Sequence, residues 1–144
     1  MVIRHSALTE QFVGTVSFHD LTVYQVAEQL CDAVWDIVRE WPVLARDTVG
    51  KQLVRSADSI GANIAEGTGR GSYLDNKRFI KIARGSFYET KHWLRRAFKR
   101  KLLTSGQTES LRPLVERLGP LINGYLRSIG KKASQVQSTV PNDE

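Results

Sequence analysis

The sequence predicts an all-α protein, an antiparallel up-down four-helix bundle, from three observations. Apolar residues recur at spacings of three and four along four long segments, which is the period of helices with one buried face. Short stretches rich in glycine, proline and capping residues separate these segments, so that consecutive helices must reverse direction. No segment shows the alternation of a half-buried strand, and no internal repeat is present.

The 144 residues are sufficient for one domain with an extension at each end. Residues 1–19 lack a sustained period, which predicts a flexible N-terminal arm. The four-helix bundle is expected over residues 20–131. The polar and aperiodic stretch that follows predicts a disordered C-terminal tail at residues 132–144.

Local signals predict where the four helices begin and end. Candidate N-caps stand before each apolar segment: Asp20 or Thr22 (with Gln25), Asp47 or Thr48, Ser72 (with Asp75), and Thr104 (with Gln107). Pro42 is expected to end the first helix, and the glycines of residues 67–71 are expected to end the second. Pro113 and Pro120 should kink or split the fourth helix, because proline removes a helical donor.

The second helix has an unusual inner face, in which small residues surround Gly61 and Asn63 adds an amide. Small residues allow a close approach of another helix, and a buried amide needs hydrogen-bond partners. We therefore expect the second and third helices to cross at Gly61 and Gly85. In this prediction the crossing is held by polar groups that satisfy one another, which are Asn63, Ser86 and Glu89.

The third helix, expected over residues 73–101, is the strongest indication of a partner. Its apolar side includes Ile82, whereas ten Lys or Arg and only one acid, Glu89, fall between Lys77 and Lys101. The formal net charge is +6 and the pI is about 9.7, which favours an anionic partner such as RNA, DNA or an acidic protein surface. The candidate nucleic-acid-binding residues are Lys77, Lys81, Arg84, Tyr88, Lys91, Arg95, Arg96, Lys99, Arg100 and Lys101.

Other candidate chemistry is weaker. Glu66 and Glu89 are carboxylates that could serve acid–base or metal chemistry, but no His or Cys stands at ligand spacing beside them. The loop at residues 67–71 lacks both the preceding strand and the lysine of a phosphate-binding loop. Cys31, the only cysteine, lies among apolar residues, which predicts a thiol packed in the core. We therefore expect no enzyme activity, metal or cofactor.

The sequence contains no apolar run long enough to span a membrane, and the first residues lack the apolar core of a signal peptide. A cytoplasmic protein without a membrane contact is the resulting expectation.

Two linked motifs resemble those of the 23S rRNA intervening-sequence protein family. The first is SIGANIAEG and the second is RFIKIARGSFYE; their matching residues are Ser59, Ile60, Asn63, Ile64, Ala65, Glu66 and Gly67, then Phe79, Ile82, Ala83, Gly85, Ser86 and Glu89. The resemblance spans about residues 18–130. It implies a four-helix bundle that assembles into a ring, usually a homopentamer. It also implies a fold similar to the accessory variability determinant of diversity-generating retroelements, a basic ring that binds a reverse transcriptase.

Two hypotheses follow for function. The first is a non-enzymatic, ring-forming accessory factor that binds nucleic acid, RNA above all, or acts in a ribonucleoprotein. The alternative is an oligomeric protein–protein interaction scaffold that binds no nucleic acid. Reversing the cations of the third helix separates the two hypotheses, because only the first predicts lost binding.

Overall fold

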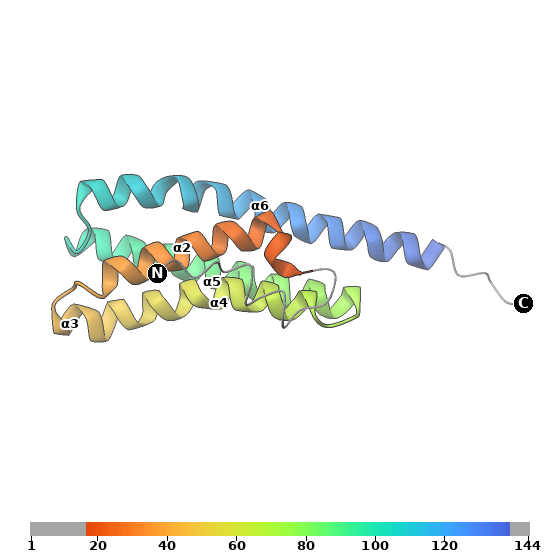
Figure 1. Cartoon of the computed structure of the whole chain (residues 1–144), viewed down its shortest axis with the longest axis horizontal. Coiled ribbons are helices and arrows are strands. Elements are labelled where there is room, and N and C mark those ends of the chain that lie inside the picture. Colours follow the sequence, from red (N-terminus) through yellow and green to blue (C-terminus); the bar gives the residue numbers. More distant parts are fainter. Residues whose placement is uncertain (1–16, 139–144) are drawn as a thin grey trace, which may run out of the picture.

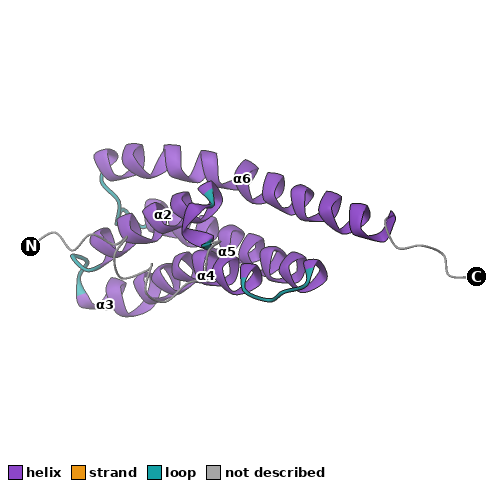
Figure 2. Cartoon of the chain, turned by 45° about the vertical axis from the view of Figure 1, so that its right-hand side comes forward, coloured by secondary structure: helices purple, strands orange, loops and turns teal. Residues whose placement is uncertain are grey.

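The computed structural model describes residues 17–138, and this part of the chain is all-α without strands (Figures 1 and 2). The long helices in this range are α2 (Thr22–Val38), α4 (Lys51–Thr68), α5 (Tyr73–Lys99) and α6 (Ser105–Ser138). The shorter elements are the 3-10 turn η1 (Phe18–Asp20), the single turn α3 (Val43–Ala45) and the π-helical turn η2 (Arg46–Gly50).

The long helices form a four-helix bundle, as the sequence predicts. Helix α4 packs against α2 and α5, and α6 packs against the same two helices from the other side. The colours of Figure 1 run in opposite senses along successive long helices, because short loops join them. Figure 1 also shows α6 continuing beyond the ends of the other helices.

The core runs along the axis of the bundle and all four long helices contribute to it. Leu30, Ile60, Ile80 and Ile122 have no exposed surface, and one of them comes from each helix. Burial of such side chains is the main contribution to the stability of a helical bundle. Each helix is therefore held by its apolar stripe, as the three- and four-residue spacing indicates.

The N-caps of the last two helices are confirmed. The Ser72 side chain accepts a hydrogen bond from the Asp75 amide at 3.1 Å. At the start of α6, the Thr104 amide donates to Gln107 Oε1 at 2.9 Å and the Gln107 amide donates to Thr104 Oγ1 at 3.1 Å, which completes a reciprocal capping box.

The caps predicted for the first two helices are wrong. Neither Asp20 nor Thr22 is the N-cap of α2: that residue is Leu21, and no side chain caps the helix. The helical path of the second helix begins directly after Pro42, with α3 and η2 leading into α4, so Asp47 and Thr48 lie inside it. Pro42 is the N-cap of this earlier start, a position where its missing N–H costs no hydrogen bond within the helix.

Gly50 explains how this early start fits the bundle. A Cβ at Gly50 would lie 2.6 Å from Val38 Cγ1 and 3.3 Å from Trp41 Cε3. Only glycine lets the π-helical turn pack so closely against the end of α2.

The last helix also differs from the prediction. Helix α6 is not split at Pro113 or Pro120, since both prolines lie inside one helix on its exposed side. It continues to Ser138, so the predicted disordered tail is wrong for residues 132–138, and residues 139–144 lie outside the described part.

Residues 18 and 19 of the predicted arm belong to η1, and residues 1–16 are not described.

Candidate nucleic-acid interface

Helix α5 carries the basic strip on a sector away from the core. Seven residues at helical spacing define this strip, which is Lys77, Lys81, Arg84, Tyr88, Lys91, Arg95 and Lys99. Lys77 and Arg84 are half-buried and the others are exposed, with Tyr88 at 58%. The structure therefore brings these predicted residues together on one face.

Within residues 17–138, no ion pair neutralises the charges of the basic strip. The ion pairs of the described residues join Arg39, Arg46, Arg70 and Arg112 to neighbouring acids, and none includes a residue of the strip. Toward α6, Arg84 Nη1 donates a hydrogen bond to Asn123 Oδ1 at 3.4 Å, an acceptor that carries no charge. An uncompensated row of cations attracts a polyanion along its whole length.

The remaining predicted cations lie outside the strip. Arg96 is half-buried, and its buried Nε has no hydrogen-bond partner among the described residues, so it does not fit the role of a freely accessible phosphate contact. Helical spacing places Arg96 and Arg100 on another side of α5. Arg100 and Lys101 are exposed where the helix ends, and Lys101 has a φ of 61° that turns the chain toward α6.

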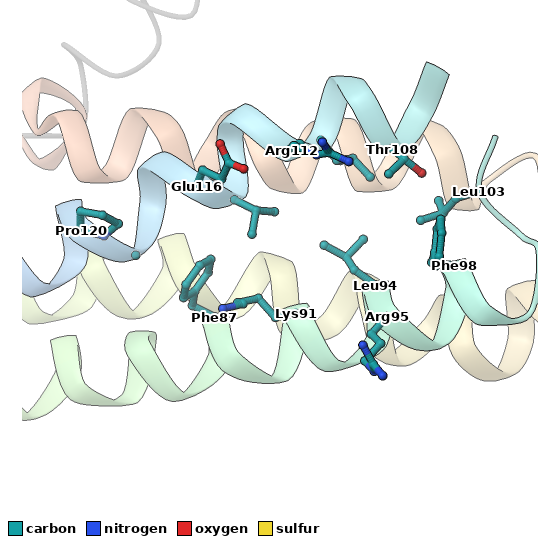
Figure 3. A pocket seen from close by; sticks show the side chains of 13 residues that line it. Phe87, Lys91, Leu94, Arg95, Phe98, Leu103, Thr108, Arg112, Glu116 and Pro120 are labelled. Carbon is teal, nitrogen blue, oxygen red and sulfur yellow. The ribbon is translucent and has the colours of Figure 1, made fainter. Parts of the chain in front are cut away.

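A groove of about 560 Å³ opens between α5 and α6 beside the basic strip (Figure 3). Its walls are mainly apolar, with Phe87, Leu94 and Phe98 from α5 facing α6. The strip residues Lys91 and Arg95 share this groove with Arg112 and Glu116 of α6. Sequence reasoning missed Phe98 and Arg112; the signal for Phe98 was an apolar residue inside the charge run AFKRK.

Gly119 shapes the floor of the groove. A Cβ at this position would lie 3.3 Å from Cε1 of Phe87, so glycine allows the Phe87 ring to pack against α6. The adjoining Pro120 lines the same groove. This glycine–proline pair therefore contributes to the surface next to the strip without interrupting the helix.

The opposite side of α5 is closed against α4 by hydroxyl groups. Ser86 Oγ donates to Ser59 Oγ at 3.0 Å, and Asn63 Nδ2 donates to the same Ser59 oxygen at 2.9 Å. One turn further along α5, Thr90 Oγ1 lies 3.1 Å from Ser56 Oγ and donates to the Ser86 carbonyl at 2.8 Å. These short side chains satisfy one another and let the two helices pack closely.

The predicted crossing at Gly61 and Gly85 is wrong. A Cβ at Gly61 would meet the ring of Tyr24 in α2 at 3.4 Å, whereas one at Gly85 would meet no atom of the described chain within 4 Å. The close approach of α4 and α5 occurs at Gly67, where a Cβ would lie 2.7 Å from Asn76 Oδ1 and 2.9 Å from Phe79 Cβ. Apolar periodicity identifies a buried face but not the helix that covers it.

Asn63, Ser86 and Glu89 also do not form the predicted cluster. Asn63 and Ser86 meet through Ser59, but Glu89 accepts a hydrogen bond from Trp93 Nε1 of its own helix at 3.2 Å. Glu66 pairs with Arg70 at 2.8 Å.

Ile82 is 46% exposed rather than part of the core, and Ile80 is fully buried instead. The register of α5 therefore places Ile82 near Gly85 and Glu89 on an exposed stripe away from the basic strip.

Among the described residues, no group of three or more acidic, His or Cys side chains could hold a metal ion. Cys31 is half-buried, and its pKa is raised to about 12 by burial first and then by neighbouring carboxylates such as those of Asp32 and Asp58. This thiol therefore stays protonated near neutral pH. In the same described range, no helix is both long and apolar enough to cross a bilayer.

The fold and the cationic face define a basic all-helical bundle. A family model described as "23S rRNA-intervening sequence protein" matches residues 19–124, and the chain belongs to that family. It is also similar to a crystal structure of a protein of unknown function from the S23 ribosomal protein family of Bacteroides thetaiotaomicron. That structure shares 24% sequence identity and a TM-score of 0.64, and the match covers 73% of this chain and 98% of the other. A search of curated proteins gave no match.

Proposed function

We propose that this protein is a cytoplasmic, non-enzymatic and ring-forming accessory factor that binds RNA or acts in a ribonucleoprotein. The observation that carries the proposal is the basic strip of α5, whose cations have no acidic partner in the described chain. A reverse transcriptase or another protein that acts on nucleic acid is the kind of partner that such a factor would assist.

The surroundings of the strip favour single-stranded nucleic acid. Tyr88 is 58% exposed and Phe98 is 55% exposed, so both rings are accessible to unpaired bases. From Lys77 to Lys99 the strip extends about 33 Å at 1.5 Å per residue, which is long enough for several phosphates. Bases inside a duplex could not reach these rings, whereas unpaired bases could stack on them.

Self-association is supported by a different surface. Gly85 is exposed and has no neighbour within 4 Å of a Cβ, although glycine inside a helix costs about 1 kcal/mol relative to alanine. Ile82 is exposed one turn before it. A second copy that packs a helix against this stripe would account for both residues, because glycine permits close helix approach.

Charge reversal tests the RNA proposal. The variant Lys91→Glu/Arg95→Glu should bind a labelled single-stranded RNA at least about tenfold more weakly, with a shallower salt dependence, because phosphate contacts are lost. The matched control is Lys131→Glu/Lys132→Glu, which makes the same change in net charge at exposed positions of α6. Fluorescence anisotropy over a salt series measures both. Equal losses in the two variants, or no binding by the unmodified protein, would contradict the proposal.

Light scattering tests the ring. The variant Gly85→Leu should lower the molar mass in solution while circular dichroism stays helical, because the added side chain blocks a contact from outside the chain. Gly130→Leu is the control, since a Cβ at Gly130 also meets nothing within 4 Å. A monomeric unmodified protein would contradict self-association.

The second candidate, a protein-binding scaffold, is favoured by exposed apolar residues at both ends of the bundle, including Leu44 at 79% and Leu74 at 80%. Such patches often mark protein contacts. If the scaffold is correct, the Lys91/Arg95 reversal leaves partner binding intact, and purified protein carries no RNA.

A further inference from the structure

A second cleft lies between α2 and the beginning of the second helix. It has a volume of about 470 Å³ and is lined by Trp35, Val38, Arg39, Arg46, Gly50, Lys51, Val54 and Arg55. The α5–α6 groove is formed by the other two long helices, so the two cavities share no residue. The basic strip of α5 does not contribute to this cleft.

The π-helical turn η2 forms part of the cleft wall. Arg46 and Gly50 are its first and last residues, and both line the cleft. Gly50 permits contact with Val38, which forms part of the cleft wall. Single π-helical turns occur frequently at functional sites, because they displace side chains from their regular helical positions.

The chemistry of the lining combines one aromatic ring with four cations. Trp35 is 57% exposed, although it is a large apolar side chain. Arg39 and Arg46 each pair with an adjacent acid at 3.4 Å, Glu40 and Asp47 respectively. Lys51 and Arg55 form no ion pair with an acid in the described part of the chain. Lys51 and Arg55 are thus two cations without an acidic partner in the described chain, and they line the same cleft as the exposed indole of Trp35.

We propose that this cleft binds one nucleotide of a single-stranded nucleic acid. The base stacks on Trp35 and the flanking phosphates contact Lys51 and Arg55. Aromatic rings bind unpaired bases through stacking, and neighbouring cations bind the backbone. The cleft volume suits a small-molecule fragment of this size. The high exposure of Trp35 leaves room for a strand to enter and leave the site, which favours a nucleotide within a strand over a free one.

The test isolates the cleft from the strip. In the Lys91→Glu/Arg95→Glu background, anisotropy with a labelled ten-nucleotide oligouridine should still show binding. Adding Trp35→Ala should weaken that binding about fivefold or more, and adding Lys51→Glu/Arg55→Glu should weaken it about tenfold or more. Trp35→Phe retains a ring and should stay within about threefold. Tyr73→Ala removes an exposed aromatic elsewhere and should change nothing. Circular dichroism checks that each variant is folded.

Several results would overturn the inference. Absence of any RNA binding in the strip-reversed background does so, and so does binding that Trp35→Ala leaves unchanged. If uridine monophosphate binds as tightly as the oligonucleotide, the ligand of the cleft is a free nucleotide and not a strand. An oligoglutamate peptide that displaces the RNA and depends equally on Trp35 would assign the cleft to an acidic protein. If instead the proposal for the basic strip is wrong, the Lys91→Glu/Arg95→Glu reversal has no effect on RNA binding by the otherwise unmodified protein.

Discussion

The two sides of α5 differ in how they meet their neighbours. Toward α4, short hydroxyl side chains such as Ser86 and Thr90 form hydrogen bonds across the contact. Gly67 has no side chain and lets the two helices approach closely. Toward α6, the aromatic residues Phe87 and Phe98 line a groove of about 560 Å³. Small residues thus close one side of α5, while the other side keeps an open groove.

The largest effect should come from filling the closed side. Gly67→Ala places a Cβ 2.7 Å from Asn76 Oδ1 and 2.9 Å from Phe79 Cβ. The second contact cannot be relieved by rotating a side chain, so the free energy of unfolding should fall by about 1–3 kcal/mol. Gly130→Ala, where no atom lies within 4 Å, should instead raise it by about 0.5–1 kcal/mol. Urea denaturation measures both, and equal effects would contradict the proposed close approach.

Removing a hydroxyl from the same side should have the next largest effect. Thr90→Val keeps the shape of a fully buried side chain but removes its contacts with Ser56 and Ser86, which should cost about 1 kcal/mol of unfolding free energy. A double-mutant cycle with Ser56→Ala should give a coupling energy of at least about 0.5 kcal/mol. Ser110→Ala, at an exposed site, is the control and should be neutral within about 0.5 kcal/mol. Full additivity of the cycle would argue against a shared contact.

The open side should tolerate added volume. Val115→Phe places a ring where the groove already has space, so the unfolding free energy should change by less than about 0.5 kcal/mol. Ala97→Val adds volume at a position of α5 with no exposed surface and should cost about 1–3 kcal/mol. Equal costs in urea denaturation would mean that the groove closes in solution.

The smallest effect concerns Cys31 of α2, outside both contacts of α5. Its pKa rises from 9.0 to about 12 on folding, so the folded protein keeps a thiol proton that the unfolded chain releases. The resulting stabilisation is complete below pH 9.0 and is lost as the pH rises toward 12. At about pH 9, iodoacetamide should alkylate the native protein at least about tenfold more slowly than the urea-unfolded chain. Equal rates would show that the thiol is not shielded.

The fold and the strip could be predicted from sequence because their signals are local. The Thr104–Gln107 capping box depends on residues three positions apart, and the strip follows from helical period alone. The start of the second helix was missed because the fit of Gly50 against Val38 involves another helix and leaves no signal in the local sequence.

Features that depend on two helices were harder to foresee. The exchange of Ile82 for Ile80 in the core is a small rotation of α5, which an apolar pattern does not resolve. The pairing of Gly67 with Asn76 and the α5–α6 groove both require the distance between helix axes. The spacing of residues within one helix does not determine that distance.

The length of α6 has a practical consequence. At 1.5 Å per residue its 34 residues measure about 50 Å, and its last turns extend past the other helices (Figure 1). A monomeric bundle would therefore scatter X-rays as an elongated particle with this rod along its length, whereas the proposed ring would scatter as a larger assembly, so small-angle X-ray scattering separates the two. A fluorophore attached near Ser138 would report on tumbling of the rod while staying clear of both clefts.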